Sequence, residues 1–75
     1  MYKKYVKEGK LSIKNKKTGY TVIEKNYKEG ILHGPLKYYW NNGNLRVQGT
    51  YSNQRRTGNW KNFDINGKVI LEENY

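Results

Sequence analysis

The side chains that could support catalysis or metal binding are few and scattered. His33 is the single histidine, in the segment Leu32-His33-Gly34, and no nucleophile or carboxylate is placed to act with it. Glu72 and Glu73 are adjacent, so on a strand they point to opposite faces and cannot act as a pair. The absence of cysteine excludes disulfides and thiolate ligands. We therefore expect a protein that is not an enzyme and holds no metal or cofactor.

Basic and aromatic residues offer binding chemistry instead. Arg55-Arg56 lies in a polar segment between predicted hairpins, and arginine suits planar, bidentate contacts with carboxylates or phosphates. Tyr38 and Trp40 share one face of a predicted strand, next to Lys37, and such aromatics commonly anchor protein interfaces. The alternative is that these arginines are solvated loop cations and these aromatics are the core of a thin sheet. The candidate partner-binding residues are Arg55, Arg56, Trp40, Tyr38, Lys37 and Lys61.

The net charge of +9 supports a second hypothesis, in which the chain binds nucleic acid or an anionic membrane surface. Residues 1–30 hold nine Lys against three Glu, whereas residues 31–75 hold six Lys or Arg against three Asp or Glu. The charge could equally serve only the solubility of an aromatic-rich chain. For this hypothesis the candidates are Lys3, Lys4, Lys7, Lys10, Lys14, Lys16 and Lys17.

An internal repeat organises the chain. Its period is 24 residues, the spacing from Gly34 to Gly58. The same spacing relates the pair Asn42-Gly43 to the pair Asn66-Gly67. We divide the single domain, residues 1–75, into units 27–51 and 51–75, preceded by a degenerate unit at about 9–27. Repeats of this length indicate modules that bury their apolar faces only against neighbouring modules.

Apolar and polar residues alternate with period two within each unit, which predicts strands. Asn42-Gly43 and Asn66-Gly67 favour two-residue type I′ turns. The sequence therefore predicts an all-β antiparallel meander of about three hairpins in an elongated single-layer sheet, without helix. The predicted pairings are Leu11–Asn15 with Tyr20–Tyr27, Leu36–Asn41 with Asn44–Tyr51, and Asn59–Ile65 with Lys68–Tyr75.

Four finer expectations follow from the same pattern. The links Lys28–Pro35 and Ser52–Gly58 are expected to be longer than tight turns, with His33 exposed in the first. Leu36 and Tyr39 are three residues apart, so a β-bulge between them would bring both to one face. The strands that end at Tyr51 and Tyr75 are each expected to be buried on one side only. Residues 2–7 are expected to form an edge strand or to stay loose.

The recurring residues resemble MORN repeats, and most closely the variant form found in bacterial antitoxin proteins of the YwqK type. The segments that carry the resemblance run from Tyr27 to Leu45 and from Tyr51 to Val69, each with Gly, an apolar residue, Lys, an aromatic and Asn-Gly in that order. The resemblance covers residues 27–75 well and 9–26 poorly. It implies a hairpin meander whose relatives bind proteins or acidic lipids.

We therefore expect a small basic protein that binds and inhibits a protein partner, as an antitoxin, an immunity protein or a phage inhibitor of a host defence enzyme. An acidic protein surface would be its target. A third hypothesis is a homodimer formed through open sheet edges. No stretch approaches the about 20 apolar residues of a membrane-spanning helix, and no apolar core follows the charged N-terminus as in a signal peptide, so we expect a cytoplasmic protein.

Overall fold

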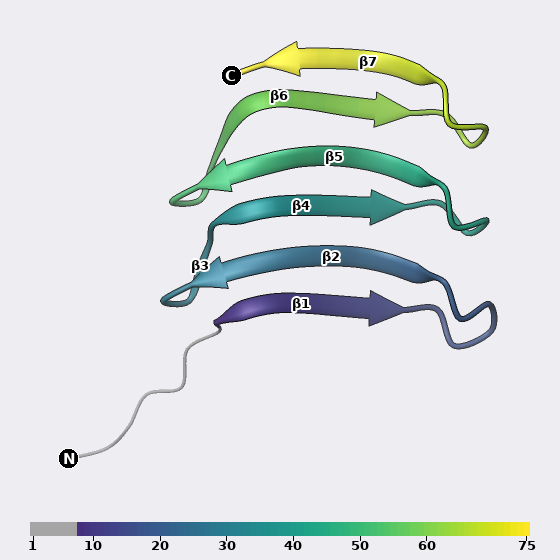
Figure 1. Ribbon diagram of the computed structural model, residues 1–75, viewed down its shortest axis with the longest axis horizontal. Coiled ribbons are helices and arrows are strands. Elements are labelled where there is room, and N and C mark those ends of the chain that lie inside the picture. Colours follow the sequence, from purple (N-terminus) through teal and green to yellow (C-terminus); the bar gives the residue numbers. More distant parts are fainter. Residues whose placement is uncertain (1–7) are drawn as a thin grey trace.

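The computed structural model describes residues 8–75 as one open sheet of seven antiparallel strands (Figure 1). The strand order β1-β2-β4-β5-β6-β7 follows the chain, and the short β3 pairs with β2. No described residue lies in a helix. The all-β hairpin meander is therefore confirmed. The strands are β1 (Gly9–Lys14), β2 (Thr21–Lys28), β3 (Ile31–Leu32), β4 (Gly34–Tyr39), β5 (Leu45–Ser52), β6 (Arg55–Phe63) and β7 (Val69–Asn74).

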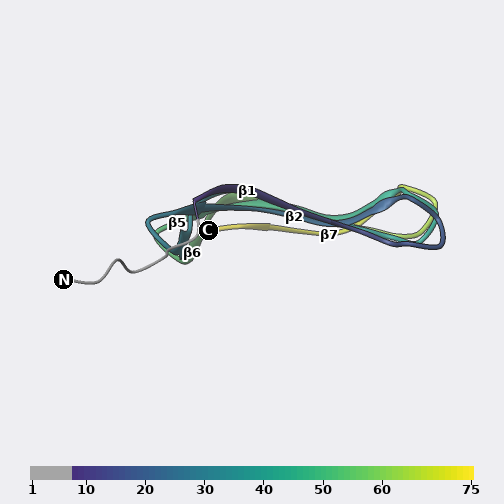
Figure 2. The ribbon, with the colours of Figure 1, turned by 90° about the horizontal axis from the view of Figure 1, so that it is seen from below.

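The sheet is a single layer, as expected. Its extents are 52 × 35 × 10 Å, and all its strands belong to one sheet, so no second layer is stacked on it within the described residues. Seen from its edge, the layer is thin along the strands and curls where the hairpins end (Figure 2). Both faces therefore lie open to solvent over much of their area. The edge strand expected at residues 2–7 lies outside the described residues.

The hairpin turns differ from the predicted type I′ turns. Gly43 N–H donates to Trp40 O, Trp40 N–H donates to Asn44 O, and in this loop only Gly43 has a positive φ, of 89°. A type I′ turn needs a positive φ at both central residues, so the prediction is wrong. The loop has three residues, with Gly in the left-handed position where the chain re-enters the strand, and the loop at Gly67 repeats this pattern.

The two links between hairpins hold the type I′ turns instead. Lys28 pairs with Ile31 across Glu29-Gly30, and Ser52 pairs with Arg55 across Asn53-Gln54. All four central residues have positive φ, between 50° and 82°. The expectation of long links is therefore wrong, and each link begins with a tight two-residue turn.

The β-bulges also lie elsewhere than predicted. Leu36 and Tyr39 belong to a strand without an extra residue, so they stay on opposite faces. The extra residue lies in the partner strand, at Val22, Arg46 and Ile70 in successive hairpins, with one repeat period between each and the next. A further irregularity falls in β6, between Thr57 and Lys61.

The core is minimal. Leu36 and Trp60, with exposures of 2% and 3%, are the only buried large apolar side chains among the described residues. Gly49 lies beneath the Trp60 indole, where a Cβ atom would lie 2.1 Å from Cδ2. Indole Nε1 donates to Thr50 O and Thr57 O, both at 3.2 Å. The expectation of one buried side is wrong for β7, an edge strand paired only with β6 in the described structure, because every residue of it is exposed.

Side chains join the ends of successive hairpins. Trp40 Nε1 donates to Phe63 O at 3.1 Å, and the amide groups of Asn42 and Asn44 both donate to Ile65 O at 2.9 Å. These bonds hold the loop of the second hairpin against that of the third. They explain why thin, weakly buried hairpins keep a common alignment.

Candidate binding surface

The strand register assigns side chains to two faces, because paired residues in an antiparallel sheet point the same way. We call one side the Trp60 face. It carries Trp60 and a mostly apolar row of paired side chains, one from each long strand. We call the opposite side the Lys37 face, and it carries a mostly polar row of paired side chains. The first row is Ile13, Ile23, Tyr38, Val47, Asn62 and Leu71, and the second is Ser12, Glu24, Lys37, Gln48, Lys61 and Glu72.

The Trp60 face is apolar for most of its width. Ile13 and Leu71 are 47% and 50% exposed, and Ile23, Tyr38 and Val47 are half-buried. Next to the middle of this row lies a shallow hollow. It is lined by Val22, Ile23, Tyr38, Tyr39, Arg46 and Val47. A cationic group therefore borders an open apolar depression.

An aromatic cluster holds Arg56 on the same face. Its guanidinium lies 4.6 Å from the ring centroid of Trp60 and 5.7 Å from that of Tyr75, and Nη1 donates to the Tyr75 hydroxyl at 3.0 Å. The hydrogen bonds to Tyr75 and Tyr51 raise the pKa of Arg56, so the group stays charged. The Trp60 ring lies nearly perpendicular to those of Tyr51 and Tyr75, with ring centroids 5.2 and 6.3 Å apart. Arg56 is thus an exposed cation held in a fixed position.

Arg46 repeats this arrangement at the other end of the face. Its guanidinium lies 4.9 Å from the ring centroid of Trp40. Arg46 is the extra residue of a bulge, so it departs from the regular alternation of side chains along β5. It lines the hollow together with its neighbour Val47. Stacking on a flat ring leaves the edge of the guanidinium available for a carboxylate.

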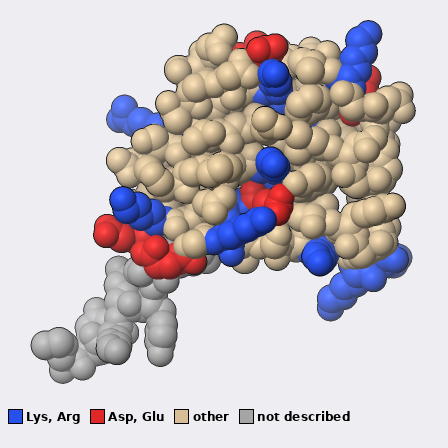
Figure 3. Space-filling view, in the orientation of Figure 1, with Lys and Arg blue, Asp and Glu red and all other residues tan. Residues whose placement is uncertain are grey.

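The Lys37 face carries charges of both signs near one another (Figure 3). Lys10 Nζ lies 2.7 Å from Glu24 Oε2, and Tyr39 donates its hydroxyl to Glu24 Oε1 at 2.5 Å. The bond to Lys10, followed by that to Tyr39, lowers the pKa of Glu24. Burial, with the bond to Glu24, raises the pKa of Tyr39 to about 12. This face is therefore a network of mutually compensated groups.

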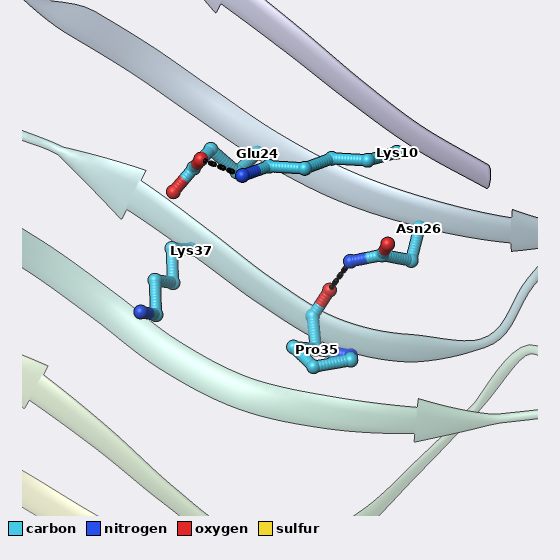
Figure 4. A pocket seen from close by; sticks show the side chains of 5 residues that line it. All are labelled: Lys10, Glu24, Asn26, Pro35 and Lys37. Atoms are coloured by element: carbon cyan, nitrogen blue, oxygen red, sulfur yellow. Dashed lines mark hydrogen bonds and ion pairs between the residues drawn. The ribbon is translucent and has the colours of Figure 1, made fainter.

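A shallow depression lies beside this network on the same face (Figure 4). Lys10 of β1 reaches Glu24 of the neighbouring strand β2. The Asn26 side chain donates to Pro35 O at 2.8 Å. Lys37 borders the depression without an ion pair in the described part of the chain. Most polar groups around the depression are engaged with each other.

The predicted partner-binding residues divide between the two faces. Tyr38, Trp40 and Arg56 belong to the Trp60 face, whereas Lys37 and Lys61 belong to the Lys37 face. Arg55 pairs with Ser52 beside a type I′ turn and is exposed on the Lys37 side. The six predicted residues therefore form no single surface. Lys37 points away from Tyr38 and Trp40, with which it was grouped in the sequence analysis.

The lysines of the second hypothesis are partly described. Lys3, Lys4 and Lys7 lie outside the described residues. Lys10 is paired with Glu24, while Lys14 ends β1 and Lys16 and Lys17 lie in the exposed loop that follows.

Sequence reasoning missed the contributions of Ile13, Ile23, Arg46 and Leu71 to the Trp60 face. Arg46 lies one repeat period from both Val22 and Ile70, the sites of the other bulges, but only the strand register identifies these positions as bulges. His33 also differs from expectation. It is half-buried, and its Nδ1 accepts the Asn53 N–H at 3.3 Å, so it links the two type I′ turns.

Residues 8–75 bring no three His, Asp or Glu side chains together in a manner suited to a metal ion. None of their segments forms a helix of the length and apolarity needed to span a membrane. Searches against protein-family models, curated proteins and solved structures return no match to this chain.

Proposed function

We infer that the chain is a small, non-enzymatic MORN-type repeat protein that binds and inhibits a protein partner through its Trp60 face. The observation that carries this proposal is the apolar row from Ile13 to Leu71, which no second layer covers within residues 8–75. Large uncovered apolar patches on small proteins commonly mark interaction sites.

Two arginines give the surface its chemical preference. Arg56 and Arg46 are exposed, and each is stacked on an aromatic ring of the Trp60 face. Because stacking fixes them before binding, less side-chain entropy is lost when they meet a carboxylate. A surface that combines apolar side chains with aspartate or glutamate would suit them. We infer a partner of this kind, in the cytoplasm.

The net charge of +9 adds long-range attraction to such an acidic partner. Association would be fast at low ionic strength and would slow as salt is added. The predicted inhibitory roles, in an antitoxin, an immunity protein or a phage anti-defence protein, all require only that this surface cover a functional region of the partner.

Capture of the partner from a lysate of cells that encode the chain tests the proposal. Two double variants give a matched comparison, Arg46→Glu/Arg56→Glu on the Trp60 face and Lys37→Glu/Lys61→Glu on the other. Both change the net charge equally, so they weaken long-range attraction to the same extent. We expect the first to lose a stoichiometric protein that the second retains after nuclease treatment. Recovery of nucleic acid, with proteins lost after nuclease, would favour the second hypothesis.

A further inference from the structure

The two edge strands of the sheet carry opposite charges. In the described residues, β1 pairs only with β2, and β7 pairs only with β6. The β1 edge contributes Lys14, beside Lys10 that is already paired with Glu24, whereas the β7 edge contributes Glu72 and Glu73. Unpaired backbone groups on an open edge are a template for another strand. Apolar side chains flank both edges, and Leu11, Ile13, Val69, Ile70 and Leu71 are between 36% and 63% exposed.

The junctions between hairpins inside the chain show which register such pairing would take. At the β2–β4 junction Glu24 faces Lys37, and at the β5–β6 junction Gln48 faces Lys61. These pairs are one repeat period apart. Glu72 lies one further period along the chain, so it is the β7 residue equivalent to Gln48. The β1 residue that corresponds to Lys61 is Ser12, because Ser12 faces Glu24 as Lys61 faces Glu72 within their hairpins.

We propose that β7 of one molecule pairs head to tail with β1 of a second copy, in the register of these internal junctions. Leu71 then faces Ile13 of the second copy, as Val47 faces Asn62 within the chain. The two apolar side chains meet on the Trp60 face and extend its row from one molecule into the next.

The same register brings opposite charges together on the Lys37 face. In the β2–β4 junction, Tyr39 of one hairpin donates its hydroxyl to Glu24 of the preceding hairpin. Lys14 is equivalent to Tyr39. Lys14 pairs with Thr21 and Tyr39 pairs with Leu45, and each partner directly precedes the bulge residue of its strand. Glu72 corresponds to Glu24, two periods later. Lys14 of the second copy therefore meets Glu72 where the internal junction has a hydrogen bond.

Symmetric pairing of two identical edges is less favourable. Two copies of β7 would place only carboxylates on neighbouring edge strands, and two copies of β1 would place only ammonium groups there. Like charges on neighbouring strands are destabilising, whereas opposite charges contribute favourably. The head-to-tail contact leaves one free edge at each end, so an assembly grows by addition unless its rotation closes a ring.

Sedimentation of the full chain over a range of concentrations tests this proposal. At low salt we expect the average mass to rise above the monomer mass of 8.9 kDa and to fall as salt is added. Lys14→Glu and Glu72→Lys should each reduce the mass toward that of the monomer. An equimolar mixture should recover association, because every edge then finds an oppositely charged edge.

The mixture also separates lost pairing from lost folding, since misfolded variants would not restore each other. Thermal unfolding of each variant alone confirms that the fold is kept. Two results would overturn the proposal: a wild-type mass of 8.9 kDa at the highest soluble concentration, or a mixture that stays monomeric.

Discussion

At the scale of single residues, the closest packing in the sheet is between Gly49 and Trp60. The indole lies flat on the backbone because Gly49 has no side chain, and a Cβ atom there would lie 2.1 Å from Cδ2. Real Cβ atoms do not approach other heavy atoms so closely. Gly49→Ala must therefore displace the ring that forms half of the buried apolar core.

We expect Gly49→Ala to lower the free energy of unfolding by about 1–3 kcal/mol, as for other overpacked cores. This is a large part of the ~3–5 kcal/mol that a core of this size supplies. Urea unfolding followed by tryptophan fluorescence measures the change. Thr50→Ala, at the exposed neighbouring position, is the control and should cost less than about 1 kcal/mol. Equal effects of the two substitutions would show that the Gly49–Trp60 contact is unimportant.

The shifted pKa values of Tyr39 and Glu24 predict a dependence of stability on pH, with burial as the main cause for Tyr39, the bond to Lys10 as the main cause for Glu24, and their mutual hydrogen bond adding to both. Folding raises the pKa of Tyr39 from 10.0 to about 12, so its contribution is complete below pH 10 and is lost as the pH rises toward 12. Folding lowers the pKa of Glu24 below 4.5, so its contribution is present above that pH and is lost in acid.

Tyr39→Phe removes the hydroxyl and should cost about 1 kcal/mol near neutral pH. The difference in unfolding free energy between the wild type and this variant should shrink between pH 10 and 12. A difference that stays constant over this range would show that the Tyr39 hydroxyl does not titrate as described.

At the scale of elements, hydrogen bonds between hairpin ends stabilise the alignment of hairpins that bury little surface. Asn42 and Asn44 both donate to Ile65 O, so either one satisfies this oxygen when the other is removed. Asn42 Oδ1 also accepts the Asn44 N–H at 3.0 Å, so we expect Asn44→Ala to have a small effect, Asn42→Ala a larger one, and the double substitution to cost about 1–2 kcal/mol.

Asn66→Ala is the matched control, one repeat period after Asn42 in a loop that faces no further hairpin in the described structure. Its effect on the unfolding temperature should be small. Strictly additive losses at Asn42 and Asn44 would contradict the sharing of Ile65 O.

The two type I′ turns make a reciprocal prediction. Gly30 and Gln54 occupy equivalent positions with φ of 82° and 69°, and a left-handed conformation strains a residue that has a side chain. Gln54→Gly should raise the unfolding free energy by up to about 1 kcal/mol, and Gly30→Gln should lower it by a similar amount. Thermal unfolding of the pair measures both, and a loss of stability in Gln54→Gly would contradict this account of the turn.

The strands and their pairing could be predicted from the period-two pattern, but the turn types could not. Asn-Gly suits both a type I′ turn and the end of a three-residue loop, and only loop length distinguishes them. Asn53-Gln54 lacks the glycine that signals a tight turn. Simple alternation would put Leu45 on the face of Val47 and Val69 on that of Leu71, but the bulges at Arg46 and Ile70 put Leu45 and Val69 on the opposite face.

At the scale of the whole molecule, a layer 10 Å thick cannot separate an interior from a surface. Composition indicated such a sheet, because tyrosine and tryptophan tolerate partial exposure. Composition could not show which charged groups share a face with them. That depends on register, which placed Lys37 and Lys61 together with Glu24 and Glu72 on the side away from Trp60.

The proposed function depends on the Trp60 face rather than on the net charge. The affinity of the captured partner for the two double variants of equal charge tests this most directly. We predict that Arg46→Glu/Arg56→Glu raises the dissociation constant by more than about 10-fold relative to Lys37→Glu/Lys61→Glu, as expected when anchoring arginines are lost. Equal dissociation constants for the two variants would contradict the account, because charge alone would then explain binding.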